Sequence, residues 1–108
     1  QKKSQVNIGP LTEQAMSNFF VDKLFIGIDG IDAKRGFTSQ DMRRSETARA
    51  MATRADEVII LTDSTKFSTK GAITEFNFSE VAKVYTDSEV KKEDISFLHE
   101  HEIKVLTV

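Results

Sequence analysis

Hydrophobic and polar positions follow two alternating patterns along the chain, one typical of buried strands and one typical of helices. Residues 23–28 and 57–62 are short apolar runs that each lead into an aspartate, as strands buried on both faces often do. Two further strands are predicted at residues 83–86 and 103–108. Because helical stretches separate these strands, the pattern predicts an α/β fold in which helices pack on a parallel sheet.

The first predicted helix begins at Pro10, since proline suits the first helical position. Its apolar residues recur at the spacing of one helix face: Leu11, Ala15 and Phe19, with Met16 and Phe20 beside them. A short helical turn is predicted near residues 79–82. A last helix is predicted around residues 92–100, with Ile95 and Leu98 facing inward.

The middle helix is predicted to start at Ser45, a residue type that caps helices, with Glu46 in the first turn. Its inner face consists of small and apolar residues, which suggests close packing on a sheet: Ala48, Met51, Ala52 and Ala55. Residues 29–43 and 63–74 are rich in polar residues, and both are predicted to be loops.

Composition excludes several classes of function. The 15 basic and 17 acidic residues nearly balance, which argues against nucleic-acid binding by this segment and against a polybasic membrane surface. No apolar run is long enough to span a membrane, and the first five residues lack the apolar core of a signal peptide. We therefore expect a cytoplasmic protein. The 108 residues suit one domain, and the lack of an initial methionine suggests that the segment starts inside a longer protein.

Metal and cofactor chemistry has little support. The chain has no cysteine, which excludes disulfides and thiolate metal sites. His99 and His101 are two positions apart, so on a helix they point to different faces and form a poor metal pair. We predict surface histidines, no metal and no cofactor.

Ligands of open parallel sheets bind beyond the carboxyl ends of the strands. Three aspartates follow predicted strands directly: Asp29, Asp63 and Asp87. The two long loops and the helix between them add further polar residues: Asp32, Thr38, Ser39, Glu46, Ser64 and Lys66. Carboxylates accept hydrogen bonds from sugar hydroxyls and a lysine can meet a phosphate, so the set suits a phosphorylated polyol.

Simpler explanations remain open for these residues. Each aspartate at a strand end could cap its loop through side-chain-to-backbone hydrogen bonds. The pair Arg43-Arg44 is expected at the surface, and the phenylalanines at 67, 76 and 78 are expected in the core or anchoring loops, although they could also form a subunit contact.

Several motifs occur together in a fixed order: Gly9-Pro-Leu-Thr-Glu, Asp22-Lys-Leu-Phe-Ile-Gly-Ile-Asp-Gly-Ile-Asp32, Gly36-Phe-Thr-Ser39, Glu46 and Asp63-Ser-Thr-Lys-Phe67. This combination, which spans nearly the whole chain, resembles the carboxy-terminal domain of DeoR-type transcriptional regulators. The resemblance implies a fold similar to ribose-5-phosphate isomerase, glucosamine-6-phosphate deaminase and CoA transferases. It also implies a phosphorylated sugar as effector, and a homo-oligomeric repressor that releases DNA when the effector binds.

On this resemblance, Asp29, Asp32, Glu46 and Lys66 match positions that resemble the acid, base and lysine positions of the isomerases. They are expected to contact the effector, with Thr38 as a fifth contact. The family's winged helix-turn-helix has no counterpart in these residues, nor has the first half of the sensor domain with its phosphate-binding loop. Residues 1–108 are therefore expected to form one wall of the pocket, and DNA would be bound only by the absent amino-terminal domain.

Two other functions stay open. A sugar-phosphate isomerase or deaminase of the same fold would use Glu46 or an aspartate as base and Lys66 to stabilise charge. The sequence Asp29-Gly-Ile-Asp32, where the isomerases have alanine at the third position, and the Gly36–Ser39 motif favour the regulator. A third possibility is an oligomerisation module without a ligand, which would leave the loop carboxylates and Lys66 without a role.

Overall fold

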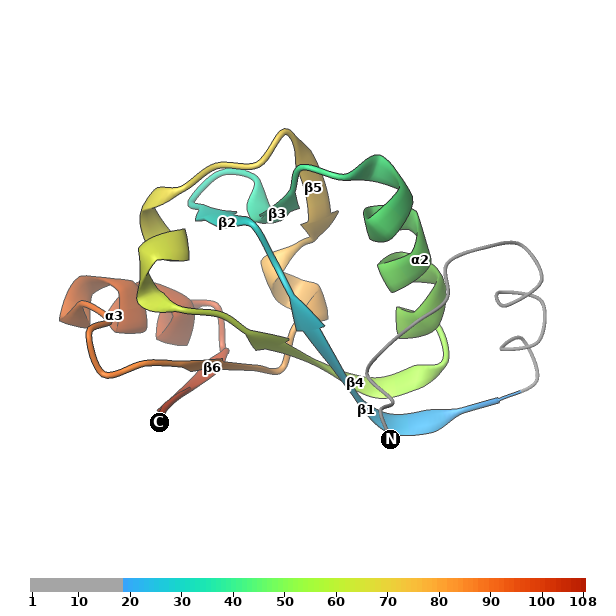
Figure 1. Ribbon diagram of the computed structural model, residues 1–108. Coiled ribbons are helices and arrows are strands. Elements are labelled where there is room, and N and C mark those ends of the chain that lie inside the picture. Colours follow the sequence, from blue (N-terminus) through green and yellow to red (C-terminus); the bar gives the residue numbers. More distant parts are fainter. Residues whose placement is uncertain (1–18) are drawn as a thin grey trace.

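A four-stranded parallel sheet forms the base of the molecule in the computed structural model, which describes residues 19–108 (Figure 1). Its strands, in spatial order, are β1 (Val21–Gly27), β4 (Ala55–Leu61), β6 (Lys83–Thr86) and β7 (Lys104–Thr107). Every neighbouring pair of strands runs parallel. The predicted parallel sheet is confirmed, and each of the four predicted strands is found.

A second, three-stranded sheet lies above the first in Figure 1. It consists of β2 (Gly30–Asp32), β3 (Gly36–Ser39) and β5 (Ile73–Phe76), paired antiparallel in the order β2-β3-β5. The prediction that residues 29–43 and 63–74 are loops was therefore wrong in part. Ile31 and Phe37 are buried in the core, so these short segments gain apolar contacts that their polar neighbours conceal in the sequence.

The pairing of β3 with β5 is irregular at one place. Phe37 is opposite Phe76 and Thr38 is opposite Thr74, so Glu75 has no partner across the ladder. One extra residue on one strand is a β-bulge, and such bulges redirect a side chain.

Helix α2 (Met42–Ala52) begins four residues before the prediction, in which Ser45 was the cap and Glu46 lay in the first turn. Asp41 caps it by accepting a hydrogen bond from the Arg44 backbone N–H, 3.1 Å away. Ser45, predicted as the cap, is instead a buried residue inside the helix. Ala55, predicted on the helix face, is the first residue of β4. Asp41 and Ser45 have similar preferences for the capping position, and the helix begins after Asp41, the earlier of the two.

Helix α3 (Lys92–Glu100) matches its prediction, and two 3₁₀ segments, η1 (Ser64–Ser68) and η2 (Phe78–Glu80), complete the structure. The core lies between the parallel sheet and the helices with the small sheet. Its central members are Ile26, Phe37, Val58, Ile60, Phe76, Val84, Leu98 and Ile103. Phe76 and Phe78 are buried and Phe67 packs against this cluster, which confirms their role as core and loop anchors.

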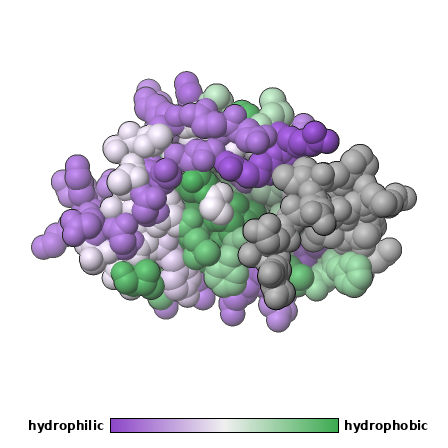
Figure 2. Space-filling view, in the orientation of Figure 1, coloured by the Kyte–Doolittle hydropathy of each residue, from purple (hydrophilic) through white to green (hydrophobic). Residues whose placement is uncertain are grey.

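The predicted helix at Pro10 falls almost wholly outside the described residues. Its last two apolar positions, Phe19 and Phe20, are described, but they are not helical and are well exposed. Figure 2 shows other hydrophobic residues at the surface in the middle of the view, below a band of polar residues. Within residues 19–108, no helix combines the length and apolarity needed to cross a membrane.

Candidate functional site

The carboxylate of Asp29 follows β1 directly, where the sequence predicted a ligand contact. Its Oδ2 atom accepts hydrogen bonds from the Gln40 backbone N–H at 2.7 Å and from the Arg44 guanidinium at 2.5 Å. The Gln40 bond holds the pKa of Asp29 below its ordinary value, with help from the Arg44 charge and against the effect of burial. The Ser39 hydroxyl also lowers this pKa, and the Asp29 side chain remains 29% exposed.

Arg44 lies in the first turn of α2, and polar contacts hold the start of that helix in place. The Arg44 guanidinium also donates to the Ser39 hydroxyl at 3.3 Å. That hydroxyl accepts a hydrogen bond from the Asp41 backbone N–H at 3.1 Å, which joins the end of β3 to the helix cap. Arg44 is partly exposed, as the sequence predicted, but it belongs to the Asp29 site, which the sequence reasoning did not foresee.

Thr38 lies next to Asp29 in the structure, because the Asp29 backbone N–H donates to the Thr38 carbonyl at 2.9 Å. Its side chain is fully buried, and its hydroxyl accepts a hydrogen bond from the Gly71 backbone N–H at 2.7 Å. The hydroxyl of Thr38 therefore ties the segment after η1 to the small sheet.

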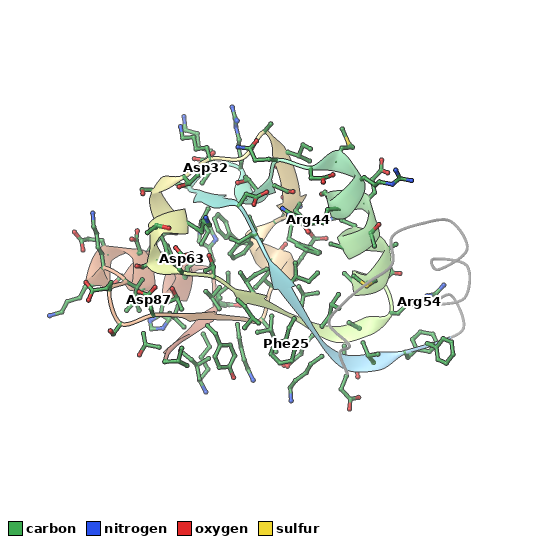
Figure 3. The ribbon with its side chains drawn as sticks, in the orientation of Figure 1. Phe25, Asp32, Arg44, Arg54, Asp63 and Asp87 are labelled. Carbon is green, nitrogen blue, oxygen red and sulfur yellow. The ribbon has the colours of Figure 1, made fainter. Side chains whose placement is uncertain are left out.

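Asp32 and Lys66 lie on two elements that pack together, β2 and η1. The Asp32 side chain is only 12% exposed and lies 3.7 Å from the Arg35 guanidinium. Figure 3 shows Asp32 at the end of the molecule where η1 and Asp63 are found, whereas Arg44 lies nearer α2. Asp29, Asp32 and Thr38 thus lie on or next to β2 and β3, and Lys66 lies on η1, which packs against β2.

Glu46 differs from the other predicted contacts in its surroundings. It is exposed on α2, while the helix buries Ser45, Thr47 and Ala48. It makes no ion pair or hydrogen bond with another residue of the described range 19–108.

Asp63 and Asp87 behave as loop caps, the simpler of the two explanations. Asp63 accepts hydrogen bonds from the backbone N–H and the hydroxyl of Thr65. Asp87 accepts from the backbone N–H groups of Ser64 and Glu89, each at 2.9 Å. These bonds lower the pKa of both carboxyls. Their oxygens hold η1 and the turn after β6 in place.

Glu75 is a chemically distinctive residue that the sequence reasoning missed. It is fully buried, and neither carboxylate oxygen has a hydrogen-bond partner within the described residues. Burial raises the pKa of Glu75 to about 7, and the positive charges of Arg44 and Arg49 oppose that rise. A signal was present in the sequence: Glu75 is a charged residue between Ile73 and Phe76, in a stretch with strand-like apolar positions.

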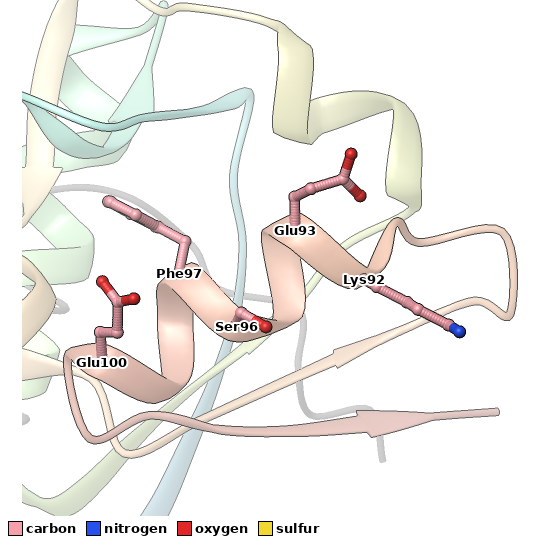
Figure 4. A pocket seen from close by; sticks show the side chains of 5 residues that line it. All are labelled: Lys92, Glu93, Ser96, Phe97 and Glu100. Carbon is pink, nitrogen blue, oxygen red and sulfur yellow. The ribbon is translucent and has the colours of Figure 1, made fainter.

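A groove along α3 includes none of these residues. Lys92, Glu93, Ser96, Phe97 and Glu100 line it (Figure 4). All five come from one helix, and the charged side chains among them are exposed to solvent. The groove has no buried polar group that would orient a ligand. Within residues 19–108, no cluster of three or more His, Cys, Asp or Glu side chains is arranged to hold a metal ion.

Comparison with known proteins adds a family match. The model of the DeoR C terminal sensor domain matches residues 1–88 of the chain. A putative aga operon transcriptional repressor of Escherichia coli O157:H7 is 26% identical over 108 residues, covering all of this chain and 40% of the relative. The glycerol-3-phosphate regulon repressor of Escherichia coli K12 is 29% identical over 98 residues, covering 91% of this chain and 39% of the relative.

A third relative is the transcriptional repressor AccR of Agrobacterium fabrum. It is 37% identical over 82 residues, which cover 74% of this chain and 31% of the relative. The chain thus spans about 40% of the length of the curated relatives it matches over most of its residues.

Proposed function

The chain belongs to the family of DeoR C-terminal sensor domains, and from that premise we propose that it senses a phosphorylated sugar for a transcriptional repressor. The names of its relatives support regulation: one is a repressor of the aga operon and another of the glycerol-3-phosphate regulon. In this proposal the sensor catalyses nothing. DNA is bound by a different domain of the complete repressor, and the repressor is a homo-oligomer.

The observation that carries the proposal is the state of Asp29. It is an ionised carboxylate at the carboxyl end of a parallel strand, the place where open α/β sheets bind ligands. Its side chain is 29% exposed, so sugar hydroxyls can reach the carboxylate. A carboxylate accepts hydrogen bonds from sugar hydroxyls, and Lys66 on η1 supplies a cation for a phosphate.

We propose five effector-contacting residues: Asp29, Asp32, Thr38, Glu46 and Lys66. Asp29 and Asp32 would accept hydrogen bonds from hydroxyl groups, and Lys66 would meet the phosphate. Thr38 would act mainly by holding the loop that contains Gly71, since its hydroxyl already accepts that bond. The proposed fold is that of the ribose-5-phosphate isomerase, glucosamine-6-phosphate deaminase and CoA transferase group, with residues 1–108 as part of the domain.

The catalytic alternative has weaker support. A general base works best when burial and neighbouring groups tune its pKa toward the working pH. Glu46 is exposed and has no polar partner in the described range that would position it. The relatives, moreover, are named as regulators.

A titration with a panel of ketose, aldose and polyol phosphates tests the proposal. The chain is labelled with nitrogen-15, and its amide spectrum and the sugar signals are followed together. We expect the amides of Asp29, Gln40 and Arg44 to shift with at least one member of the panel, while the sugar stays chemically unchanged. Turnover of the sugar would replace the proposal with the catalytic alternative. A spectrum that no sugar phosphate perturbs would contradict the proposal, and the unphosphorylated sugars serve as matched controls for the phosphate.

A further inference from the structure

The charges of Asp29 and Arg44 act on the carboxyl of Glu75, a residue that the proposed function does not use. Its side chain is fully buried and its two carboxylate oxygens lack a hydrogen-bond partner among the described residues. Burying a polar group without such a partner costs free energy. A donor that reached Glu75 would therefore stabilise the structure around it.

An irregularity in the backbone of β5 sets the direction of the Glu75 side chain. Glu75 is the extra residue of the β-bulge between β3 and β5. Strand β5 packs against α2, the helix that carries Arg44 and Arg49. Bulges occur often beside functional sites because they turn a side chain away from its regular direction.

The charges of three residues shift the pKa of Glu75. Asp29 comes from the connection between β1 and β2, and Arg44 and Arg49 come from α2. The uncharged hydroxyl of Ser39, on β3, lowers this pKa as well.

The two arginines differ in their freedom to move. Arg49 is fixed, because it pairs with both carboxylate oxygens of Glu80 and donates to the backbone carbonyl of Glu75 at 2.7 Å. Among residues 19–108, Arg44 has one ion-pair partner, Asp29, and its side chain is 46% exposed. It also donates to the Ser39 hydroxyl, and that hydroxyl lowers the pKa of both Asp29 and Glu75. Arg44 is therefore the donor that can change partners.

We propose that Arg44 is a latch that exchanges between two carboxylates: it binds Asp29 in the molecule described here and moves to Glu75 when hydroxyl groups of a ligand occupy Asp29. The ligand-dependent half of this inference rests on the proposed function, which assigns a phosphorylated sugar to Asp29. The exchange supplies the donor that Glu75 lacks. Because Arg44 belongs to α2 and Glu75 to β5, the exchange also makes the contact between these two elements depend on whether ligand is bound.

The latch links ligand binding to protons. Burial raises the pKa of Glu75 to about 7 in the molecule described here. An approaching guanidinium favours the ionised carboxylate and lowers that pKa. Ligand binding then releases a proton, so affinity rises with pH near neutrality. A fall of one pKa unit corresponds to an increase of affinity by about tenfold at high pH relative to low pH.

The exchange is tested without ligand by a double-mutant cycle on the full chain. Glutamate side chains are labelled with carbon-13, the Glu75 signal is assigned by its absence in Glu75→Gln, and its titration midpoint is measured. Asp29→Asn removes the charge that holds Arg44, and the same substitution is made in an Arg44→Gln background. We expect a larger fall of the midpoint when Arg44 is present, because the arginine transfers. Equal falls in both backgrounds would mean that only repulsion from Asp29 was lost, and would overturn the latch.

Arg43→Gln, on the same helix turn and exposed, replaces Arg44→Gln as the matched control and should leave the fall caused by Asp29→Asn unchanged. If Asp29→Asn does not fold, the wild-type chain is titrated with the sugar phosphate panel instead. Binding that tightens with pH in the wild type and is flat in Glu75→Gln supports the latch. Binding with the same pH profile in both chains overturns it. Where Asp29→Asn folds, absence of binding by every sugar phosphate contradicts the proposed function alone, because the ligand-free cycle decides separately whether Arg44 exchanges.

Discussion

Arg49 of α2 and Glu80 of η2 form a two-point ion pair, in which each guanidinium nitrogen lies 3.1 Å from one carboxylate oxygen. Glu80 also accepts a hydrogen bond from the Asn77 backbone N–H at 2.8 Å. Arg49 donates to the Glu75 carbonyl at 2.7 Å and lies over the Phe76 ring. The pair therefore joins α2 to the end of β5 through several contacts at once.

We expect Arg49→Lys to destabilise the chain, because a lysine keeps the charge and loses the two-point geometry. Both side chains are more than one third exposed, so solvent screens the pair and the expected loss is about 1 kcal/mol. Urea unfolding at neutral pH measures it. Arg43→Lys, an exposed position on the same helix, is the control and should leave the midpoint unchanged. A midpoint of Arg49→Lys equal to that of the parent chain would contradict this role.

The buried carboxyl of Glu75 predicts how stability depends on pH. Its pKa in the folded chain is about 7, above its ordinary value of 4.5. Between these values the folded chain keeps a proton that the unfolded chain has lost, so stability falls as pH rises from about 4.5 to about 7. A shift of this size corresponds to a loss on the order of 3 kcal/mol.

Glu75→Gln removes the ionisation and keeps the shape of the side chain. We expect the variant and the parent to have similar stability near pH 5 and the variant to be more stable at pH 8. Urea unfolding at the two pH values measures the difference. Glu100→Gln on the exposed side of α3 is the matched control and should not change the pH dependence. If the stability of the parent and of Glu75→Gln fell equally between the two pH values, Glu75 would not be the responsible group.

Two glycines on either side of Asp29 differ sharply in the space around them. A Cβ atom added at Gly30 would lie 2.1 Å from the Thr69 carbonyl oxygen, a backbone atom that cannot move aside alone. A Cβ atom added at Gly27 would meet only the Leu61 carbonyl oxygen, at an ordinary 3.9 Å. We expect Gly30→Ala to lose about 2–3 kcal/mol of stability through overpacking, and Gly27→Ala to change little. Thermal unfolding of both variants checks this, and equal losses would refute the close approach of Thr69 to β2.

The large elements could be predicted from the sequence because their signals are local. The apolar runs before Asp29 and Asp63 have the length and content of strands buried on both faces, and they are β1 and β4. The small sheet could not be predicted in this way. Its strands have only three or four residues, too few for a periodic pattern, and Ile31 and Phe37 were hidden among polar neighbours. Its third strand pairs with a segment far away in the chain.

The candidate site likewise contains residues that local sequence signals predict and residues that depend on contacts between distant segments. Asp29 could be predicted, because a polar residue at the end of a parallel strand lies where ligands bind. Arg44 and Glu75 could not, since the bond of Arg44 to Asp29 and the burial of Glu75 depend on tertiary contacts of α2 and β5. The start of α2 has a similar explanation. Asp41 and Ser45 are both good caps, and the burial of Ser45 against the fold decides between them.

Lys66 gives the most direct test of the proposed effector contacts. It lies on η1, and within residues 19–108 the backbone of Lys66 bonds only to neighbours in the chain. Its N–H donates to the Asp63 carbonyl and its carbonyl accepts from the Thr69 N–H. Removing its side chain should therefore leave the fold intact. A charged hydrogen bond to a phosphate contributes about 1.5–3 kcal/mol, so Lys66→Ala should weaken binding of a sugar phosphate by roughly tenfold or more. Calorimetric titration measures the affinity, and Lys70→Ala, an exposed lysine of the next segment, is the control. Equal affinities of Lys66→Ala and Lys70→Ala would remove Lys66 from the site, whereas a loss confined to phosphorylated ligands would assign it to the phosphate.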